Sequence, residues 1–134
     1  MEHPDDLYYN RAHIWVRVEG TRGTIGVTDF AQHEMGEILF VDFPEEGSQI
    51  EKDDVFGTLE SSKTVAELHS PVSGEIASIN KDLEEEPSLV NDDPYGKGWL
   101  VVVEIDDPQE LEDMLNAADY EDVLEQKDEE GEEE

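Results

Sequence analysis

The fold is decided by the stretch Val55-Phe56-Gly57-Thr58-Leu59-Glu60-Ser61-Ser62-Lys63-Thr64-Val65-Ala66-Glu67-Leu68. Two strand-like runs, 55–60 and 64–68, are separated by the three residues 61–63. A connection this short joins antiparallel strands in a tight hairpin, although it lacks the Asn-Gly pair favoured in two-residue turns. The sequence therefore predicts a β-hairpin with Lys63 at its tip.

Further strand-like runs flank this hairpin on both sides. Apolar runs and alternation predict strands over 12–18, 24–27, 37–43, 75–79 and 99–105. Thr28 and Asp29 are typical of a helix start and Gly36 of a helix end, which predicts about two helical turns over 30–35. Residues 80–94 are polar and include two prolines, so we expect a long loop there. The pattern predicts an all-β fold with small helical additions, a flattened sandwich or barrel of two sheets.

The period of the apolar residues changes near the C-terminus. Asp107 and Pro108 form a typical helix start, and apolar residues follow at helical spacing up to 118. Asp119 is a candidate cap for a second short helix. The acidic residues 127–134 have nothing to bury, so we expect a disordered tail after a single domain over 1–126.

The charge balance excludes several classes of function. Asp and Glu number 38 against 8 Lys and Arg, a formal net charge of −30. Such a chain lacks the basic patch with which nucleic-acid binders neutralise phosphates, and an anionic membrane would repel it. With no cysteines, it forms no disulfides, thiolate metal sites or thiol nucleophiles. We therefore expect no nucleic-acid partner and no membrane partner.

The acidic excess has two interpretations, an ordinary acidic protein or adaptation to a high-salt cytoplasm. At 1 M salt the Debye length is about 3 Å, so self-repulsion is screened. Five lysines beside 38 acidic residues favour the second interpretation. The chain has no apolar run near the ~20 residues of a membrane span and no secretion signal at its start, so we expect a soluble, cytoplasmic protein.

Lys63 is the residue that the sequence singles out for chemistry. An ε-amine on a flexible four-carbon stem is a target for acylation, and a hairpin tip would project it toward another enzyme. Position alone leaves an ordinary surface lysine as the alternative. The four histidines lack metal-ligand spacing, and no glycine-rich phosphate loop opens a helix. We therefore expect no self-sufficient active site and no metal site.

Five stretches together resemble the H-protein family of the glycine cleavage system. The family's lipoylation segment is Glu-Ser-Val-Lys, and here Glu60-Ser61-Ser62-Lys63 stands in its place. The remaining similarity lies in 24–32, 35–44, 70–76 and 91–100. The resemblance implies a lipoyl/biotinyl-like barrel-sandwich hybrid, with lipoate in amide linkage on Lys63 and no catalytic site of its own.

The resemblance also implies a set of partners. The lipoyl arm would carry an aminomethyl group from glycine decarboxylase to the folate-dependent aminomethyltransferase, and dihydrolipoyl dehydrogenase would reoxidise it. A lipoate ligase or a lipoyl transferase would attach the arm. The cofactor supplies the chemistry, and the carrier supplies tethering and orientation.

Two positions depart from the family's usual residues, and a third matches them. Ser62 replaces the family's usual Val, and Ile14 stands where the family usually has a Glu near the loaded arm. Glu67 matches a commonly acidic position and is a candidate arm contact; the alternative is a solvated strand residue. Other functions remain open, among them an H-like carrier that relays lipoate to other proteins and an unlipoylated interaction module.

Overall fold

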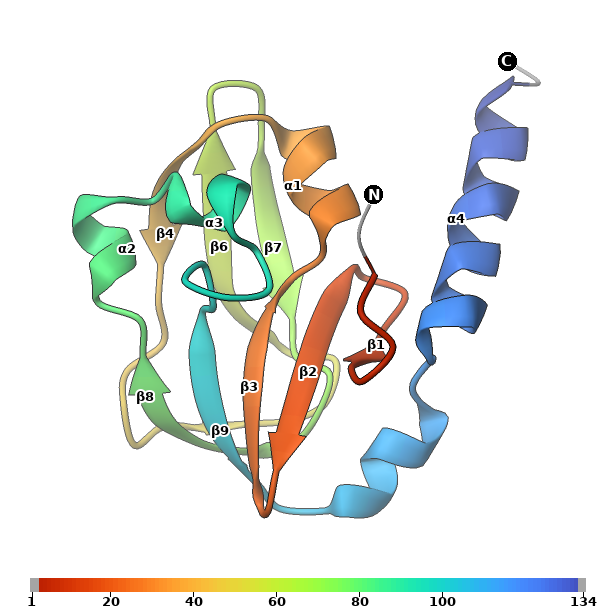
Figure 1. Ribbon diagram of the computed structural model, residues 1–134. Coiled ribbons are helices and arrows are strands. Elements are labelled where there is room, and N and C mark those ends of the chain that lie inside the picture. Colours follow the sequence, from red (N-terminus) through yellow and green to blue (C-terminus); the bar gives the residue numbers. More distant parts are fainter. Residues whose placement is uncertain (1–2, 133–134) are drawn as a thin grey trace.

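The computed structural model describes residues 3–132, with side chains up to residue 125 in the last helix (Figure 1). The N-terminal half contains β1 (Tyr8–Tyr9), β2 (Ile14–Glu19), β3 (Arg22–Val27), α1 (Asp29–Met35), β4 (Ile38–Asp42), β5 (Gln49–Ile50) and β6 (Val55–Ser61). The C-terminal half contains β7 (Val65–His69), β8 (Gly74–Ile79), α2 (Asp82–Glu85), α3 (Leu89–Asp92), β9 (Val101–Ile105), a 3₁₀ helix (Pro108–Asp113) and α4 (Ala117–Glu132).

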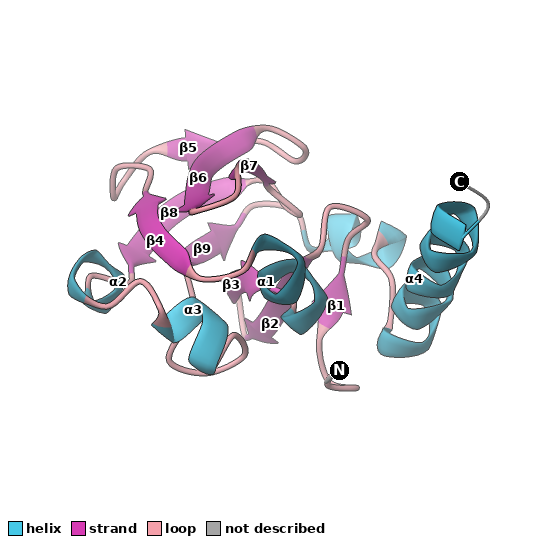
Figure 2. Cartoon of the chain, turned by 90° about the horizontal axis from the view of Figure 1, so that it is seen from above, coloured by secondary structure: helices cyan, strands magenta, loops and turns pink. Residues whose placement is uncertain are grey.

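The strands form two antiparallel sheets that pack as a sandwich. The larger sheet has the order β1-β2-β3-β9-β8-β5 and the smaller one β4-β6-β7, and Figure 2 shows the two layers facing one another. Between the layers, both sheets contribute inward-facing residues that are 0–1% exposed, among them Val16, Ile25, Leu59, Ile76 and Val103. The expected all-β, two-sheet fold with small helical additions is therefore confirmed.

A second group of buried residues fastens the C-terminal helix to the edge of the larger sheet. Tyr9 and Tyr120 stack with ring centroids 4.8 Å apart. The indole N–H of the fully buried Trp15 donates to the carbonyl oxygens of Val27 and Pro94, at 2.9 and 3.1 Å. We call this group the aromatic cluster: Leu7, Tyr9, Trp15, Phe30, Tyr95, Ala117, Tyr120 and Leu124.

Helix α1 forms where the sequence predicts it. The Thr28 hydroxyl accepts a hydrogen bond from the Ala31 amide at 3.2 Å, which caps the first turn. Gly36 ends the helix with φ 78°, a conformation that glycine adopts without a side-chain penalty. The corner between α1 and β4 is therefore sharply defined, and it lies beside the β6–β7 hairpin (Figure 1).

The segment expected to be one long loop, 80–94, contains α2 and α3 instead. Each short helix is anchored by one buried side chain, Leu83 in α2 and Val90 in α3. The segment is mostly polar and contains prolines, so these two apolar residues do not indicate helices in the sequence. The two-residue strands β1 and β5 also escape prediction, because they are too short to show alternation.

The C-terminal helices differ in detail from the prediction. Asp107 caps as expected, its carboxylate accepting from the Gln109 amide at 3.0 Å, but the helix is a single 3₁₀ segment that stops before Met114. Asn116, not Asp119, accepts the hydrogen bond at the start of α4. Helical backbone continues over 127–132, where we expect a disordered tail; the Lys and three Glu in this range are good helix formers. Residues 133–134 of that tail lie outside the described residues.

Candidate functional site

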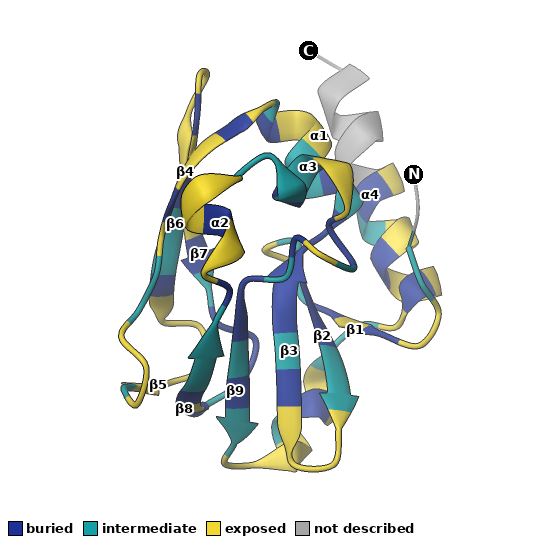
Figure 3. Ribbon diagram, turned by 60° about the vertical axis from the view of Figure 1, so that its left-hand side comes forward, coloured by how far each residue is buried: buried dark blue, intermediate teal, exposed yellow. Residues whose placement is uncertain are grey.

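Lys63 lies in the exposed turn between β6 and β7, as predicted. Figure 3 shows the end of this hairpin projecting from the molecule. The buried hydroxyl of Ser61 accepts hydrogen bonds from the backbone amides of Lys63 and Thr64, both at 3.2 Å. The Ser61 amide donates to the Thr64 carbonyl oxygen at 2.8 Å and closes the turn. One serine therefore fixes the backbone that presents the lysine.

The stem of Lys63 lies against the C-terminal end of α1. A Cβ built on Gly36 would stand 3.4 Å from Lys63 Cε and 3.6 Å from Nζ, so glycine leaves room for the lysine there. The partial negative charge at a helix C-terminus favours a nearby ammonium group. Among the residues that the structure describes, Lys63 forms no ion pair, whereas Lys52 lies 3.5 Å from Asp113 and Lys81 lies 3.8 Å from Glu46.

Asn91 holds the corner between α1 and β4 from the other side. Its side-chain amide donates to Gln32 Oε1 at 3.0 Å and to the Gly36 carbonyl oxygen at 2.8 Å. Its side-chain oxygen accepts from the Ile38 amide at 2.8 Å. Sequence reasoning did not single out Asn91, because its three partners lie more than 50 residues away in the chain.

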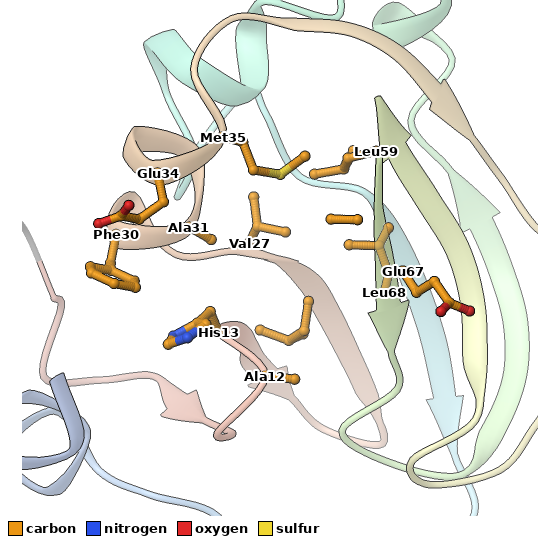
Figure 4. Close-up of a pocket in the computed structure, with 12 residues that line it drawn as sticks. Ala12, His13, Val27, Phe30, Ala31, Glu34, Met35, Leu59, Glu67 and Leu68 are labelled. Atoms are coloured by element: carbon orange, nitrogen blue, oxygen red, sulfur yellow. The ribbon is translucent and has the colours of Figure 1, made fainter. Parts of the chain in front are cut away.

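A mostly apolar pocket of about 300 Å³ opens between α1 and the inner face of the small sheet (Figure 4). Met35, which precedes Gly36, is one of its walls, so the pocket begins close to the corner that the Lys63 stem touches. Its lining is Ala12, His13, Ile14, Val27, Phe30, Ala31, Glu34, Met35, Leu59, Ala66, Glu67 and Leu68.

His13 links this pocket to the aromatic cluster. Its ring lies 4.8 Å from the ring of Phe30, and its Nδ1 shares a hydrogen bond of 2.8 Å with the Tyr120 hydroxyl. The same hydroxyl also pairs with Thr28 Oγ1 at 2.7 Å. Burial raises the pKa of Tyr120 to about 12. The wall of the pocket therefore depends on the docking of α4.

Ile14 and Glu67 both line the pocket, but differently. Ile14 is 1% exposed and makes its part of the wall apolar. Glu67 is opposite Thr58 in the strand register, on the outer face of the small sheet, and its carboxylate points away from the other lining side chains (Figure 4). The pocket is therefore lined by the backbone and stem of Glu67 and not by its carboxylate.

The match to a protein-family model decides the family. The model for the glycine cleavage H-protein matches residues 7–127. The chain belongs to this family. Glycine cleavage H-proteins are lipoyl carriers that act as a non-catalytic subunit of the glycine cleavage system, so the expected carrier role, the lipoate cofactor and the lack of catalysis are confirmed for the chain.

Individual relatives agree with the family assignment. The chain is 50% identical over 123 residues to the H protein of Salinibacter ruber, covering 92% of this chain and 99% of that one. It is 45% identical over 126 residues to the H protein of Bacillus subtilis, covering 94% and 99%. The crystal structure of an H protein from Mycobacterium marinum superposes with a TM-score of 0.81 at 32% identity, covering 87% of this chain and 94% of that one.

The helices also show whether a membrane-crossing segment is present in the described part of the chain. None of the helices in the described part of the chain combines the length and the apolar character that a membrane crossing requires.

Proposed function

We propose that Lys63 is the residue that carries the lipoyl group. The observation that supports this is an exposed lysine at a hairpin tip whose backbone is held by a buried serine hydroxyl and whose ammonium has no carboxylate partner among the described residues. An amine in this position loses no ion pair when it becomes an amide. Gly36 leaves space beside its stem, so the residues present fit an acyl chain on Nζ.

We further propose that the pocket beneath the tip shelters the far end of the arm. A covalently held lipoyl group would supply a disulfide that accepts the aminomethyl group on one sulfur, and the dithiol left after that group has been passed on would be reoxidised to the disulfide. The apolar walls formed by Val27, Met35 and Leu59 exclude water from a ring lying among them. Glu34 is a polar lining residue that could contact the arm, whereas Ile14 is apolar.

Glu67 remains part of this proposal in a restricted form. Its backbone and stem line the pocket, and its carboxylate faces the opposite side of the sheet. We propose that any contact between Glu67 and the arm is made by its stem, so Glu67→Gln should change arm binding little.

The proposed partners follow from the carrier role. They are glycine decarboxylase, the aminomethyltransferase and dihydrolipoyl dehydrogenase, with a lipoate ligase or lipoyl transferase that attaches the arm. We propose that the protein acts in the cytoplasm, where these enzymes and the carrier would meet.

The test is modification of the full chain by a purified lipoate ligase with ATP and lipoate, read by intact mass. Wild-type protein should gain one lipoyl group, and Lys63→Arg should gain none. Lys81→Arg is the matched control, an exposed lysine with a carboxylate nearby, and should behave like wild type. Lys63→Arg should also abolish glycine turnover in the reconstituted system while the melting temperature stays the same. An adduct that persists in Lys63→Arg would overturn the assignment.

A further inference from the structure

Large apolar side chains that remain exposed gather next to Lys63. Leu39, Phe40 and Val65 are 52%, 56% and 59% exposed, and we call these three residues the tip patch. Of the described residues, two other large apolar side chains are comparably exposed, Tyr8 and Val55, and both are less so. The chain has a net charge of −30. Exposed apolar side chains at one end of one sheet therefore need an explanation.

The strand register places two residues of the tip patch, Phe40 and Val65, on the outer face of the small sheet. Phe40 is opposite Glu60, and Glu60 is opposite Val65, so the three side chains form one row across β4, β6 and β7. Side chains directly opposite one another stand about 5 Å apart, so Phe40 and Val65 each lie beside Glu60, which stands between them. Leu39 lies in the β-bulge between Ile38 and Phe40. This row is the last outward-facing one before the turn that bears Lys63, because the next pair, Ile38 and Ser61, is buried.

Neither the core nor the pocket accounts for the tip patch. The inward positions next to this row, Val41 and Leu59, are already buried. The pocket opens on the inner face of the same sheet, whereas Phe40 and Val65 face outward. Exposed apolar groups gathered in this way mark a surface that binds another molecule.

The position of the tip patch points to the enzyme that modifies Lys63. In the attachment step, the ammonium group of Lys63 first gives up a proton to solvent, and the neutral Nζ attacks the carbonyl carbon of an activated lipoyl group such as lipoyl adenylate. A C–N bond forms, the bond from that carbon to the AMP oxygen breaks, and Nζ loses a proton to solvent. Before this step there is no arm, so the enzyme must approach within one lysine side chain of the hairpin. It therefore covers the residues that adjoin the tip.

The surrounding charges indicate what the partner's surface carries. Glu37, Asp42 and Glu60 are exposed around the tip patch. A partner with apolar residues ringed by Lys and Arg would be complementary, whereas a second copy of this acidic chain would be repelled. Resting on the proposed function, we infer that the tip patch is the docking surface for the lipoyl-attaching enzyme, and that this enzyme presents an apolar contact with a basic rim.

The test measures the kinetics of lipoylation on the full chain. Phe40→Ser combined with Val65→Thr should raise the KM for the carrier about tenfold, a typical effect of losing a buried contact residue, while kcat stays within about twofold. Val55→Thr is the control, because Val55 is exposed on the same hairpin at the end away from Lys63. Its KM should equal that of wild type. Thermal melts of all three proteins should agree, because the altered side chains face solvent.

The outcomes separate this inference from the assignment of Lys63. If wild-type protein accepts no lipoyl group, the proposed function fails. If wild type is modified and the double variant keeps the wild-type KM, or Val55→Thr raises it equally, the docking surface is wrong and Lys63 stands. If the double variant is lipoylated normally but, once loaded, reacts poorly with glycine decarboxylase, the tip patch serves that enzyme and the inference is overturned. Self-association that the double variant abolishes would overturn it as well.

Discussion

The hairpin tip around Lys63 is exposed to solvent, whereas the aromatic cluster is buried. Lys63 projects into solvent, and its backbone is held by the hydroxyl of Ser61. Trp15 and Tyr120 have no exposed surface, and their polar atoms are bonded to backbone and side-chain partners. The proposed lipoyl attachment site therefore lies in an exposed turn, apart from the buried residues of the aromatic cluster.

The two regions meet at the pocket. Phe30 belongs to the aromatic cluster and also lines the pocket, and His13 contacts both Phe30 and Tyr120. Changes at the tip should therefore alter function with little effect on stability. Changes in the aromatic cluster should alter stability first and arm binding as a consequence.

The largest expected effect comes from salt. With a net charge of −30, each repulsive pair costs about 1 kcal/mol at 4 Å in water, and total stability is only about 5–15 kcal/mol. Lowering KCl from molar to tens of millimolar should abolish the native circular dichroism or greatly lower the melting temperature. Deletion of residues 127–134 should change little.

The salt dependence should also distinguish the two regions. Asp5, Asp6, Glu112 and Asp119 line one groove between the N-terminal segment and the start of α4, where their charges repel. Hydrogen exchange at low salt should therefore accelerate in α4 before it accelerates in β8 and β9. A melting temperature that is flat across the salt range would exclude adaptation to a high-salt cytoplasm.

Truncation of the aromatic cluster should be the next largest effect. Trp15→Ala removes the largest fully buried side chain and leaves the carbonyl oxygens of Val27 and Pro94 without their donor. We expect a loss of about 3–5 kcal/mol in the free energy of unfolding, measured by urea denaturation in molar KCl. Lys63→Arg, assayed in parallel, should lose none. Equal losses of unfolding free energy in Trp15→Ala and Lys63→Arg would show that the two regions contribute equally to stability.

A smaller effect is expected from the Tyr120 hydroxyl. Tyr120→Phe removes its hydrogen bonds to Thr28 and His13 and should cost about 1–3 kcal/mol. Tyr8→Phe, on an exposed tyrosine, is the control.

The same variant should change the response to alkaline pH. The folded protein keeps the Tyr120 proton up to a pKa of about 12, whereas the unfolded chain releases it near 10. Wild-type stability should therefore fall as the pH rises from 10 to 12, and Tyr120→Phe should flatten this decline. A decline of unchanged steepness would show that other groups cause it.

The smallest effect on stability is expected at the tip itself. Ser61→Ala removes the acceptor of the Lys63 and Thr64 amides, which can turn to water instead, and should cost about 1 kcal/mol. The rate of lipoylation should nevertheless fall several-fold, because the lysine is no longer held in one orientation. Ser61→Thr keeps the hydroxyl and should restore the rate. A normal rate in Ser61→Ala would show that the turn is held by other contacts.

The sequence determined the features that depend on near neighbours. The β6–β7 hairpin follows from two apolar runs three residues apart, and helix α1 follows from Thr28 and Gly36 at its two ends. Lys63 was identified by its position between these strands and by its resemblance to a known segment. Hairpin turns and helix caps are local interactions, so a short window of sequence contains what is needed to predict them.

Tertiary structure alone decided the surroundings of Lys63. The three hydrogen bonds of Asn91, the placement of the Lys63 stem against Gly36 and the outward direction of the Glu67 carboxylate join residues far apart in the chain or depend on strand register. Helices α2 and α3 are each anchored by one buried side chain, Leu83 and Val90. That these two residues are anchors can be recognised only once the fold that buries them is known. Register and packing are settled by the burial of both sheets at once, and a one-residue shift would turn every side chain of a strand to the other face.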